Sequence, residues 1–483
     1  MNIGRRRFLE RALVGAAGLA LMPGCKSSSG AKSAHPKFKL KGREALDIAV
    51  DAYIFGFPLV KMELTRLVMT NVQFPEGMNA PMGRFARIRT YPPASNHDVT
   101  TPSTDMLYTG AWFDVTKEPW VVSIPDTQDR YCMFPLLDGW STVFAAPGKR
   151  TTGTAAQQFA IVGPHWKGKL PPKVAEYRSA TGIVWLLGRV ACTGTSADYA
   201  AARAVQDGCS AVPLSQYGKP YQPATGSVDP SIDMSTPVRR QVASLDIGPY
   251  LNYLALLMKN NPPTKADSAI VKRMARLGIV PGQPFDINQL PPMSVEFLKT
   301  VPELALNKIK NWYKEGAKSG ESIVENGWTM PVKAGRYGTD YLQRALVAGI
   351  GLGANLPQDT LYAISGTDGA GNPYTGNFRY VIHFEPDQLP PVNAFWSLTL
   401  YDGDYFFVDN ALGRYSLGSR DDLKRNPDGS LDIYIQRHPP GAALEANWLP
   451  AAEEKFVLML RMYWPKETLL KGQWKIPPVK YTG

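Results

Sequence analysis

The chain of 483 residues is too long for one small core, so two or more domains are expected, and its 44% hydrophobic and 20% charged residues are ordinary for a globular protein. The formal net charge of +11 comes with no arginine-rich stripe or RNA-binding aromatic signature, which argues against nucleic-acid binding and favours affinity for anionic surfaces such as an envelope or acidic sugars. The 41 Pro and 43 Gly are spread along the chain, which indicates many short elements joined by turns, as in β-rich folds.

Residues 1–24 are predicted to be an export signal. A basic run at residues 5–7 precedes an apolar stretch at residues 12–22, which is too short to span a bilayer as a helix. Residues 5–9 resemble the twin-arginine pattern R-R-x-F-L, but Gly4 and Glu10 depart from its usual flanks, so the twin-arginine and general secretory routes both stay open.

The end of this signal predicts a lipid anchor. Residues 21–25 resemble a lipoprotein cleavage box with Cys25 to be lipidated; the alternative is a plain signal that is cleaved nearby. Residues 25–40 have the composition of a flexible tether, and no later segment reaches 18 apolar residues. The sequence therefore predicts a periplasmic protein or a membrane-anchored lipoprotein, without indicating which membrane the anchor enters.

Three further cysteines lie among apolar or small residues, namely Cys132, Cys192 and Cys209. They are expected to be buried free thiols, with a Cys192–Cys209 bridge as the alternative.

The first predicted folded unit covers residues 41–194. It begins with a helix over residues 41–70, in which apolar residues recur at helical spacing and which Gly56 and Pro58 are expected to kink or divide. From residue 91 to about residue 190 the pattern changes to short apolar runs bounded by Pro, Gly, Asp or Lys. This spacing predicts an antiparallel sandwich or barrel.

Residues 195–335 are predicted to be a helical and loop connector, and residues 336–483 a second β unit opened by a helix near Tyr341. The helical segments of the connector are "SADYAAARAVQDG", "ADSAIVKRMARLG" and "VPELALNKIKNWYKEGAKSG". The predicted strands of the second unit are "FRYVIHFE", "FWSLTLY", "YFFVD", "LDIYIQR" and "FVLMLRMYW". The expected fold class is therefore α+β, mainly β with helices.

Period-two alternation in the second unit separates an apolar face from a polar and aromatic one. The apolar face is expected to build the core, and in the central strand it holds Trp396, Leu398 and Leu400. Other strands add Phe378, Tyr380, Ile382, Phe384, Leu431, Ile433, Ile435, Phe456, Leu458, Leu460 and Met462 to it. The opposite face is either an ordinary wetted surface or a cleft that recognises sugars or other polar, ring-shaped ligands.

Candidate ligand-binding residues come from this polar face and from the turn that follows the central strand. They are His383, Glu385, Ser397, Thr399, Tyr401, Arg414, Arg461 and Tyr463. Arg414 and Arg420 could bind an anion, or they could anchor their turn by hydrogen bonds, which is the favoured interpretation.

Candidate catalytic residues lie in one loop before the first strands: His97, Asp98, Asp105 and Tyr108. A His–Asp pair can orient a base or bind a metal ion, but loops also use such residues to satisfy their own backbone. His383 and Glu385 could supply two metal ligands, yet the five His residues are scattered and no CxxC occurs. No G-x-S-x-G, Walker loop or H-E-x-x-H motif is present, so no metal or cofactor is predicted.

Several blocks of the sequence resemble a bacterial exported or envelope family that pairs domain of unknown function 1254 with domain of unknown function 1214. The blocks are "DAYIFGFPLV", "TPSTDMLYTGAWFDVTKEPWVVSIPD", "DRYCMFPLLDGWSTVFAAPGKRTTG", "GPHWKG", "RALVAGIGLGAN", "LPPVNAFWSLTLYD", "FFVDNALGRYSLG", "NPDGSLDIYIQ" and "NWLPA". The resemblance implies two β-sandwich domains of jelly-roll type with a helical connector. Asp105 and Tyr108 match its pattern N-x-D-T-L-Y-S, whereas Ser103 and Met106 depart from it. The family supplies no established reaction, so no catalytic role is carried over.

Three functional hypotheses follow from the sequence. The leading one is an exported, lipid-anchored binding or envelope protein that presents aromatic and hydroxyl-rich surfaces to a small polar ligand or an envelope component. The alternative is a periplasmic hydrolase or lyase acting on a sugar-like or ester substrate. The third is an oligomeric structural subunit, which predicts apolar patches on the sandwich edges.

Overall fold

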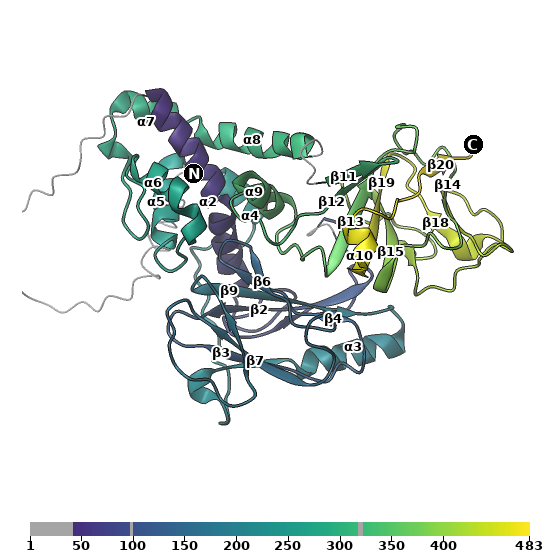
Figure 1. The fold of residues 1–483 in the computed structure, drawn as a ribbon, viewed down its shortest axis with the longest axis horizontal. Helices are drawn as coiled ribbons and strands as arrows, with labels where there is room; N and C mark the ends of the chain where they lie inside the picture. The colour runs from purple at the N-terminus through teal and green to yellow at the C-terminus, as the bar shows by residue number, and fades with distance from the viewer. Residues whose placement is uncertain (1–41, 97–99, 317–321) are drawn as a thin grey trace, which may run out of the picture.

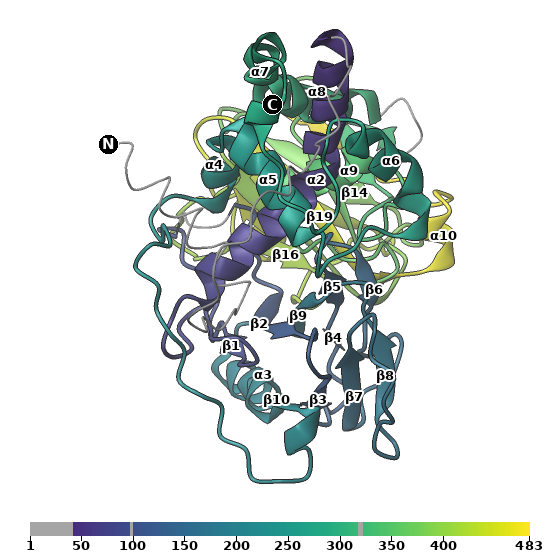
Figure 2. The same ribbon diagram turned by 90° about the vertical axis from the view of Figure 1, so that its left-hand side faces the viewer.

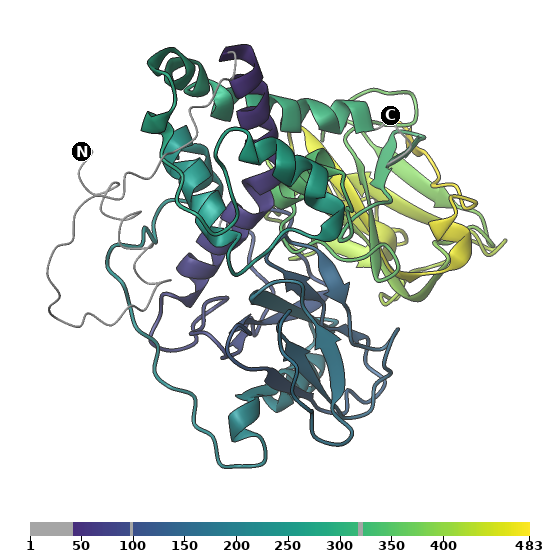
Figure 3. The ribbon, with the colours of Figure 1, turned by 60° about the vertical axis from the view of Figure 1, so that its left-hand side comes forward.

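The computed structural model describes residues 42–96, 100–316 and 322–483, in which two β-sandwiches are accompanied by a group of helices (Figure 1). Figure 3 shows the helices above the N-terminal sandwich, with the C-terminal sandwich beside both. The proposed lipidation site Cys25 and the candidates His97 and Asp98 lie outside the described residues.

The N-terminal sandwich consists of two sheets around one apolar core. One has the order β1-β2-β9-β5-β6 with β4 also paired to β9, and the other has the order β10-β3-β7-β8. The strands are β1 (Ala86–Arg87), β2 (Met106–Asp114), β3 (Trp120–Ile124), β4 (Cys132–Met133), β5 (Leu136–Asp138), β6 (Val143–Ala145), β7 (Gln157–Val162), β8 (Ala175–Arg178), β9 (Ile183–Ala191) and β10 (Ser210–Pro213). Phe113 of β2 and Phe159 of β7 are buried in the core that the two sheets share.

Two elements that follow residue 194 belong to this sandwich, although residues 195–335 were predicted to be connector. The strand β10 pairs with β3, and its Ala211 lies opposite Val122. The helix α3 (Ser196–Gly208) is capped by Thr195 and buries Ala202 and Val205 in the sandwich core. The sequence predicted the helix itself correctly, but its apolar face gives no indication of the sheet on which it packs.

The remaining helices form a core of their own. They are α2 (Gly42–Thr70), α4 (Val238–Ala243), α5 (Ile247–Leu257), α6 (Ser268–Ala275), α7 (Pro292–Leu298), α8 (Val301–Gly316) and α9 (Tyr341–Ile350). The long helix α2 extends from this group down onto the N-terminal sandwich (Figure 2), where Met62 packs with Trp112 and Trp185.

Gly56 and Pro58 were predicted to kink or divide the first helix, and the division does not occur, because α2 is continuous with Pro58 inside it. A Cβ placed on Gly56 would lie 2.5 Å from the Leu254 side chain of α5. The glycine therefore permits close packing of two helices. Burial of α2 on several sides offsets the hydrogen bond that a proline removes from a helix.

The C-terminal sandwich pairs a six-stranded sheet of order β11-β12-β13-β19-β15-β16 with a four-stranded sheet of order β18-β17-β14-β20. The strands are β11 (Ser322–Glu325), β12 (Trp328–Pro331), β13 (Thr360–Ser365), β14 (Tyr380–Phe384), β15 (Val392–Asp402), β16 (Ser416–Gly418), β17 (Leu431–Gln436), β18 (Trp448–Pro450), β19 (Phe456–Pro465) and β20 (Val479–Tyr481), with the short helix α10 (Glu467–Leu470) after β19. The strands β11 and β12 fall within the predicted connector. They join this sandwich because β12 pairs with β13.

The predicted alternation in this sandwich is confirmed for the central strand. Trp396, Leu398 and Leu400 lie in the core between the two sheets. Phe378 was expected on the same face but is 43% exposed, because it precedes the start of β14. Residues 405–409 were expected to form a strand, but they form a loop with one isolated bridge between Phe407 and Tyr401.

The predicted fold class, α+β with several sheets and helices, is confirmed. Cys132, Cys192 and Cys209 are buried free thiols, so the alternative Cys192–Cys209 bridge is not formed. Within the described residues, no helix combines the length and apolar character needed to cross a membrane.

Candidate functional site

The polar face of the six-stranded C-terminal sheet packs against the N-terminal sandwich. Five of the candidate residues lie on this face and are at most 3% exposed: Ser397, Thr399, Tyr401, Arg461 and Tyr463. Their alignment follows from the register of β15 and β19, which places Ser397 opposite Arg461 and Phe395 opposite Tyr463. We call the polar groups that meet here the junction: the five residues above with Asp105, Tyr108, Arg189, Asn355, Tyr362 and Arg420.

Asp105 of the N-terminal domain is the acceptor around which one half of the junction is organised. Its Oδ2 accepts hydrogen bonds from Ser397 Oγ at 2.6 Å and from the Tyr463 hydroxyl at 3.1 Å. Its Oδ1 forms an ion pair with Arg420 Nη2 at 3.0 Å. Asp105 is 2% exposed, so three donors from the other domain compensate a buried charge.

Arg461 organises the other half of the junction through neutral acceptors. Its Nη1 donates to Thr399 Oγ1 at 2.6 Å, and its Nη2 donates to the carbonyls of Thr101 and Pro102 at 3.1 and 3.2 Å. Nη2 also contacts the Tyr401 hydroxyl, which donates to the Pro102 carbonyl at 2.6 Å. A single arginine therefore ties the C-terminal sheet to the loop that precedes β2.

The tyrosines of the junction are uncharged hydrogen-bonding groups. Burial raises the pKa of Tyr401 to about 12, and burial raises the pKa of Tyr362 and Tyr463 as well. Their hydroxyls therefore keep their protons at neutral pH and can donate to an acceptor.

Tyr108 and Tyr362 are half-buried, as is Arg420, whereas the other residues of the junction are buried. The Arg189 guanidinium lies 5.5 Å from the Tyr108 ring and donates to the Gly353 carbonyl at 2.7 Å. Tyr362 lies opposite Arg461 in the register of β13 and β19, and its hydroxyl accepts from Asn355 Nδ2 at 3.0 Å. These two tyrosines, one from each domain, therefore keep part of their surface exposed at the junction.

The Ser397 hydroxyl donates to a carboxylate that has two further donors, so Ser397 is not poised as the nucleophile of a Ser–His pair. No group of three or more His, Cys, Asp or Glu side chains in the described ranges is arranged to hold a metal ion.

The other candidates lie elsewhere. His383 Nδ1 is 2.6 Å from Asp432 Oδ1 on the neighbouring strand, and its Nε2 is 3.6 Å from Glu385 Oε1, on the solvent-facing side of the four-stranded sheet. Arg414 donates to the carbonyls of Glu445 and Trp448, which is the turn-anchoring role favoured from the sequence.

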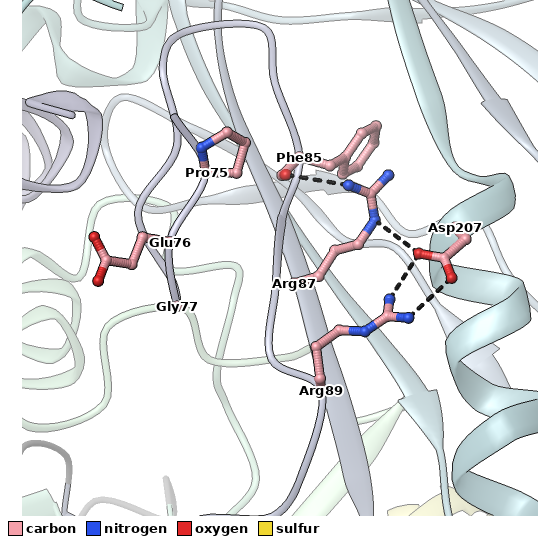
Figure 4. A pocket seen from close by; sticks show the side chains of 7 residues that line it. All are labelled: Pro75, Glu76, Gly77, Phe85, Arg87, Arg89 and Asp207. Carbon is pink, nitrogen blue, oxygen red and sulfur yellow. Dashed lines mark hydrogen bonds and ion pairs between the residues drawn. The ribbon is translucent and has the colours of Figure 1, made fainter. Parts of the chain in front are cut away.

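A surface pocket of about 240 Å³ lies on the N-terminal domain (Figure 4). Two arginines line it, but Arg89 forms a bidentate pair with Asp207, and Arg87 donates to backbone carbonyls of residues 85, 206 and 209. With Glu76 also in the wall, the formal charges of the pocket cancel.

Four junction residues were not among the sequence candidates: Arg189, Asn355, Tyr362 and Arg420. The favoured prediction for Arg420 is a turn-anchoring role, with anion binding as the alternative, whereas the structure pairs it with Asp105 and with the Cys192 carbonyl of the other domain. Arg189 gave a signal that could have been used, since it is a lone charge in the apolar run of β9. Asn355 and Tyr362 gave no such signal in the sequence, because β13 was not predicted as a strand.

The two matching family models fall on different sandwiches, the first over β1 to β10 and the second over β13 to β19. DUF1254, a protein of unknown function, matches residues 82–213, and DUF1214, also a protein of unknown function, matches residues 359–467. The crystal structure of the VPA0106 protein from Vibrio parahaemolyticus is similar over 91% of this chain and 100% of that one, with 25% identity and a TM-score of 0.67. An uncharacterised protein from Burkholderia cenocepacia matches over 91% and 95% of the two chains, with 12% identity and a TM-score of 0.41. No curated protein matches the chain.

Proposed function

Because this chain pairs domain of unknown function 1254 with domain of unknown function 1214 across one buried polar junction, we propose that it is an exported, lipid-anchored protein that binds a small polar ligand at that junction. The observation that carries the binding role is the half-buried pair Tyr108 and Tyr362. One lies on each side of the domain boundary, beside the arginines Arg189 and Arg461. Aromatic rings with a few fixed polar groups are typical of sites for small polar ligands.

The apolar contacts around the polar groups of the junction favour a preformed binding site. Met106, Tyr131 and Met133 of one domain pack with Phe395 and Tyr463 of the other. Apolar contacts thus surround the polar ones, which holds the donors in place before a ligand arrives and lowers the ordering cost of binding.

A thermal-shift screen of the purified full chain against sugars, organic acids and metal ions tests the binding role. A ligand at 100 times its dissociation constant should stabilise the protein by about 2.7 kcal/mol. The variants Y108F and Y362F, which remove only hydroxyls, should lose the shift. Y434F is the matched control, because Tyr434 lies on β17 outside the junction and should keep it. A flat response of the unmodified chain to the whole screen would leave the binding proposal without support.

The export and anchor parts of the proposal rest on the sequence. Residues 5–9 and 21–25 supply the twin-arginine-like and lipobox-like patterns. The variant C25S should lose incorporation of labelled palmitate and move from the membrane fraction to the soluble fraction. Unchanged labelling in C25S would refute the anchor.

The competing function is a periplasmic hydrolase or lyase, and one observation favours it. Asp105 of the first domain meets Ser397 and Tyr463 of the second within hydrogen-bond distance, as an active site between domains would require. Turnover of an ester or glycoside that is abolished in S397A, while S397A still binds the substrate, would establish this alternative over simple binding.

A further inference from the structure

The arginines at the junction differ in whether they form an ion pair with a carboxylate. Arg420 pairs with Asp105, and Arg150 pairs with Asp359 at 2.6 Å. Arg189 and Arg461 have no carboxylate partner in the described part of the chain. They donate to carbonyls and hydroxyls instead. Neither guanidinium is therefore in an ion pair within that part of the chain, although Asp105 is among the charged groups near Arg461.

Both arginines are also buried, since Arg189 is 7% and Arg461 is 3% exposed. Removing a guanidinium from water is unfavourable unless an opposite charge or a full set of hydrogen bonds replaces the hydration. An oxyanion placed between Tyr108 and Tyr362 would supply the missing charge. Arginine is well suited to this, because its planar fork matches carboxylate and phosphate oxygens.

Two buried acceptors beside the same site lack partners. Asn355 Oδ1 has no hydrogen bond, although Asn355 Nδ2 donates to Tyr362, and Asp359 Oδ2 is likewise unpaired. Buried polar atoms are nearly always paired with protein or ordered water, so these oxygens can accept a donor from a ligand or from a water molecule. A simple anion without N–H or O–H groups could not itself donate to them.

We infer that the ligand of the junction is a small oxyanion that also carries hydroxyl groups, namely a sugar acid, a hydroxy acid or a sugar phosphate. Its anionic group lies toward Arg189 and Arg461, and a hydroxyl donates to Asn355 Oδ1. This inference rests on the proposed binding function and specifies the chemistry of its ligand. The carboxylate and phosphate forms share this chemistry, and separate ligands distinguish them.

Isothermal titration of the full chain with four probes tests the inference. D-glucuronate and D-glucose 6-phosphate carry both features, D-glucose lacks the charge, and acetate lacks the hydroxyls. At least one of the first two should bind ten times more tightly than either of the others, and its affinity should fall as salt rises. The stronger of the two decides between carboxylate and phosphate.

The variant R189Q should lose at least tenfold in that affinity. R414Q is its matched control, because Arg414 also donates to two backbone carbonyls but lies outside the junction. R189K keeps the charge and should retain more affinity than R189Q, which separates loss of charge from loss of folding.

The outcomes distinguish this inference from the binding function. Glucose binding as tightly as the two anions would overturn the inference and leave the binding function standing. Equal affinities of R189Q and R414Q for the anion would also overturn the inference. No heat from any probe, together with a flat thermal-shift screen, would overturn both.

Discussion

The C-terminal sandwich has two polar faces with the same alternating sequence pattern, but one is buried by the N-terminal domain and the other is exposed to solvent. The outer face of β13, β15 and β19 is covered by the N-terminal domain, and its Ser397 and Arg461 are each 3% exposed. The outer face of β14 and β17 faces solvent, and the His383 and Glu385 side chains keep 32% and 57% of their surface. Alternation thus identifies which residues leave the core, while the neighbouring domain decides whether they form a site.

The two faces should also differ in energy. A hydrogen bond or ion pair on the exposed face competes with water and contributes little. On the covered face, loss of one partner leaves the other buried and unpaired, which is far more costly. Matched substitutions on the two faces measure this difference directly.

The largest effect is expected for D105A. This variant leaves Arg420 without its ion pair and Ser397 and Tyr463 without their acceptor, so unfolding should become easier by about 3–5 kcal/mol. Urea denaturation followed by tryptophan fluorescence measures the change. The control D432A removes the carboxylate beside His383 on the exposed face and should cost no more than about 1 kcal/mol. Equal losses in the two variants would remove the energetic distinction between the faces.

Asp138 is a second buried carboxylate, and it has no ion-pair partner among the described residues. Substituting it tests how burial alone affects the stability of the protein. Asp138 accepts bonds from the backbone N–H groups of Trp140 and Thr142, and burial raises its pKa from 3.8 to about 6. The folded protein therefore binds this proton more tightly than the unfolded chain. Protonated Asp138 therefore contributes fully to the free energy of unfolding below about pH 4. This contribution is lost as the pH rises to about 6, because the buried carboxyl then has to ionise.

The variant D138N carries no charge at any pH and can accept the same two bonds. Its stability relative to the unmodified chain should grow between pH 4 and pH 6 and reach about 3 kcal/mol above pH 6. Thermal unfolding over a pH series checks this expectation. A gain at pH 8 no larger than at pH 4 would contradict the stated cause.

A smaller effect is expected for Y463F, which deletes only the hydroxyl that donates to Asp105. A hydrogen bond to a charged group contributes about 2 kcal/mol, so the free energy of unfolding should fall by about that amount and the urea midpoint should fall with it. Y434F makes the same chemical change on β17 of the solvent-facing sheet and should leave the midpoint nearly unchanged. Equal destabilisation of Y434F and Y463F would contradict the expected difference between the covered face and the solvent-facing face.

The smallest effect is expected for H383A. It removes the cross-strand contact with Asp432, which should be worth about 0.5 kcal/mol on a face exposed to water. Thermal unfolding should therefore detect little change. A loss as large as that of D105A would show that the exposed face supports a structural role of its own.

Much of the fold could be predicted from the sequence because it follows from local periodicity. The helices α3, α8 and α9 and the strands β2, β9, β15, β17 and β19 lie where the pattern placed them. The errors have local causes as well. Gly56 and Pro58 looked like helix breakers, yet one allows close approach to Leu254 and the other is tolerated inside a buried helix.

The candidate site could be predicted only in part. Ser397, Thr399, Tyr401, Arg461 and Tyr463 were selected from alternation, and Asp105 and Tyr108 from a polar loop, but nothing in the pattern linked the two groups. Arg189 was missed although it is a lone charge in an apolar strand, and Asn355 and Tyr362 were missed because β13 was not predicted. His383 and Glu385 had the same pattern as the junction residues and lie outside it.

The sequence by itself determined the export-like start, the helical and β regions and the side of each strand that turns away from the core. These depend on residues that are close in the chain, where spacing dictates direction. The tertiary structure alone decided that one polar face is covered, that Asp105 receives three donors and that Arg189 and Arg461 are left without a carboxylate. Compensation of a buried charge depends on groups hundreds of residues apart, and no local pattern carries that information.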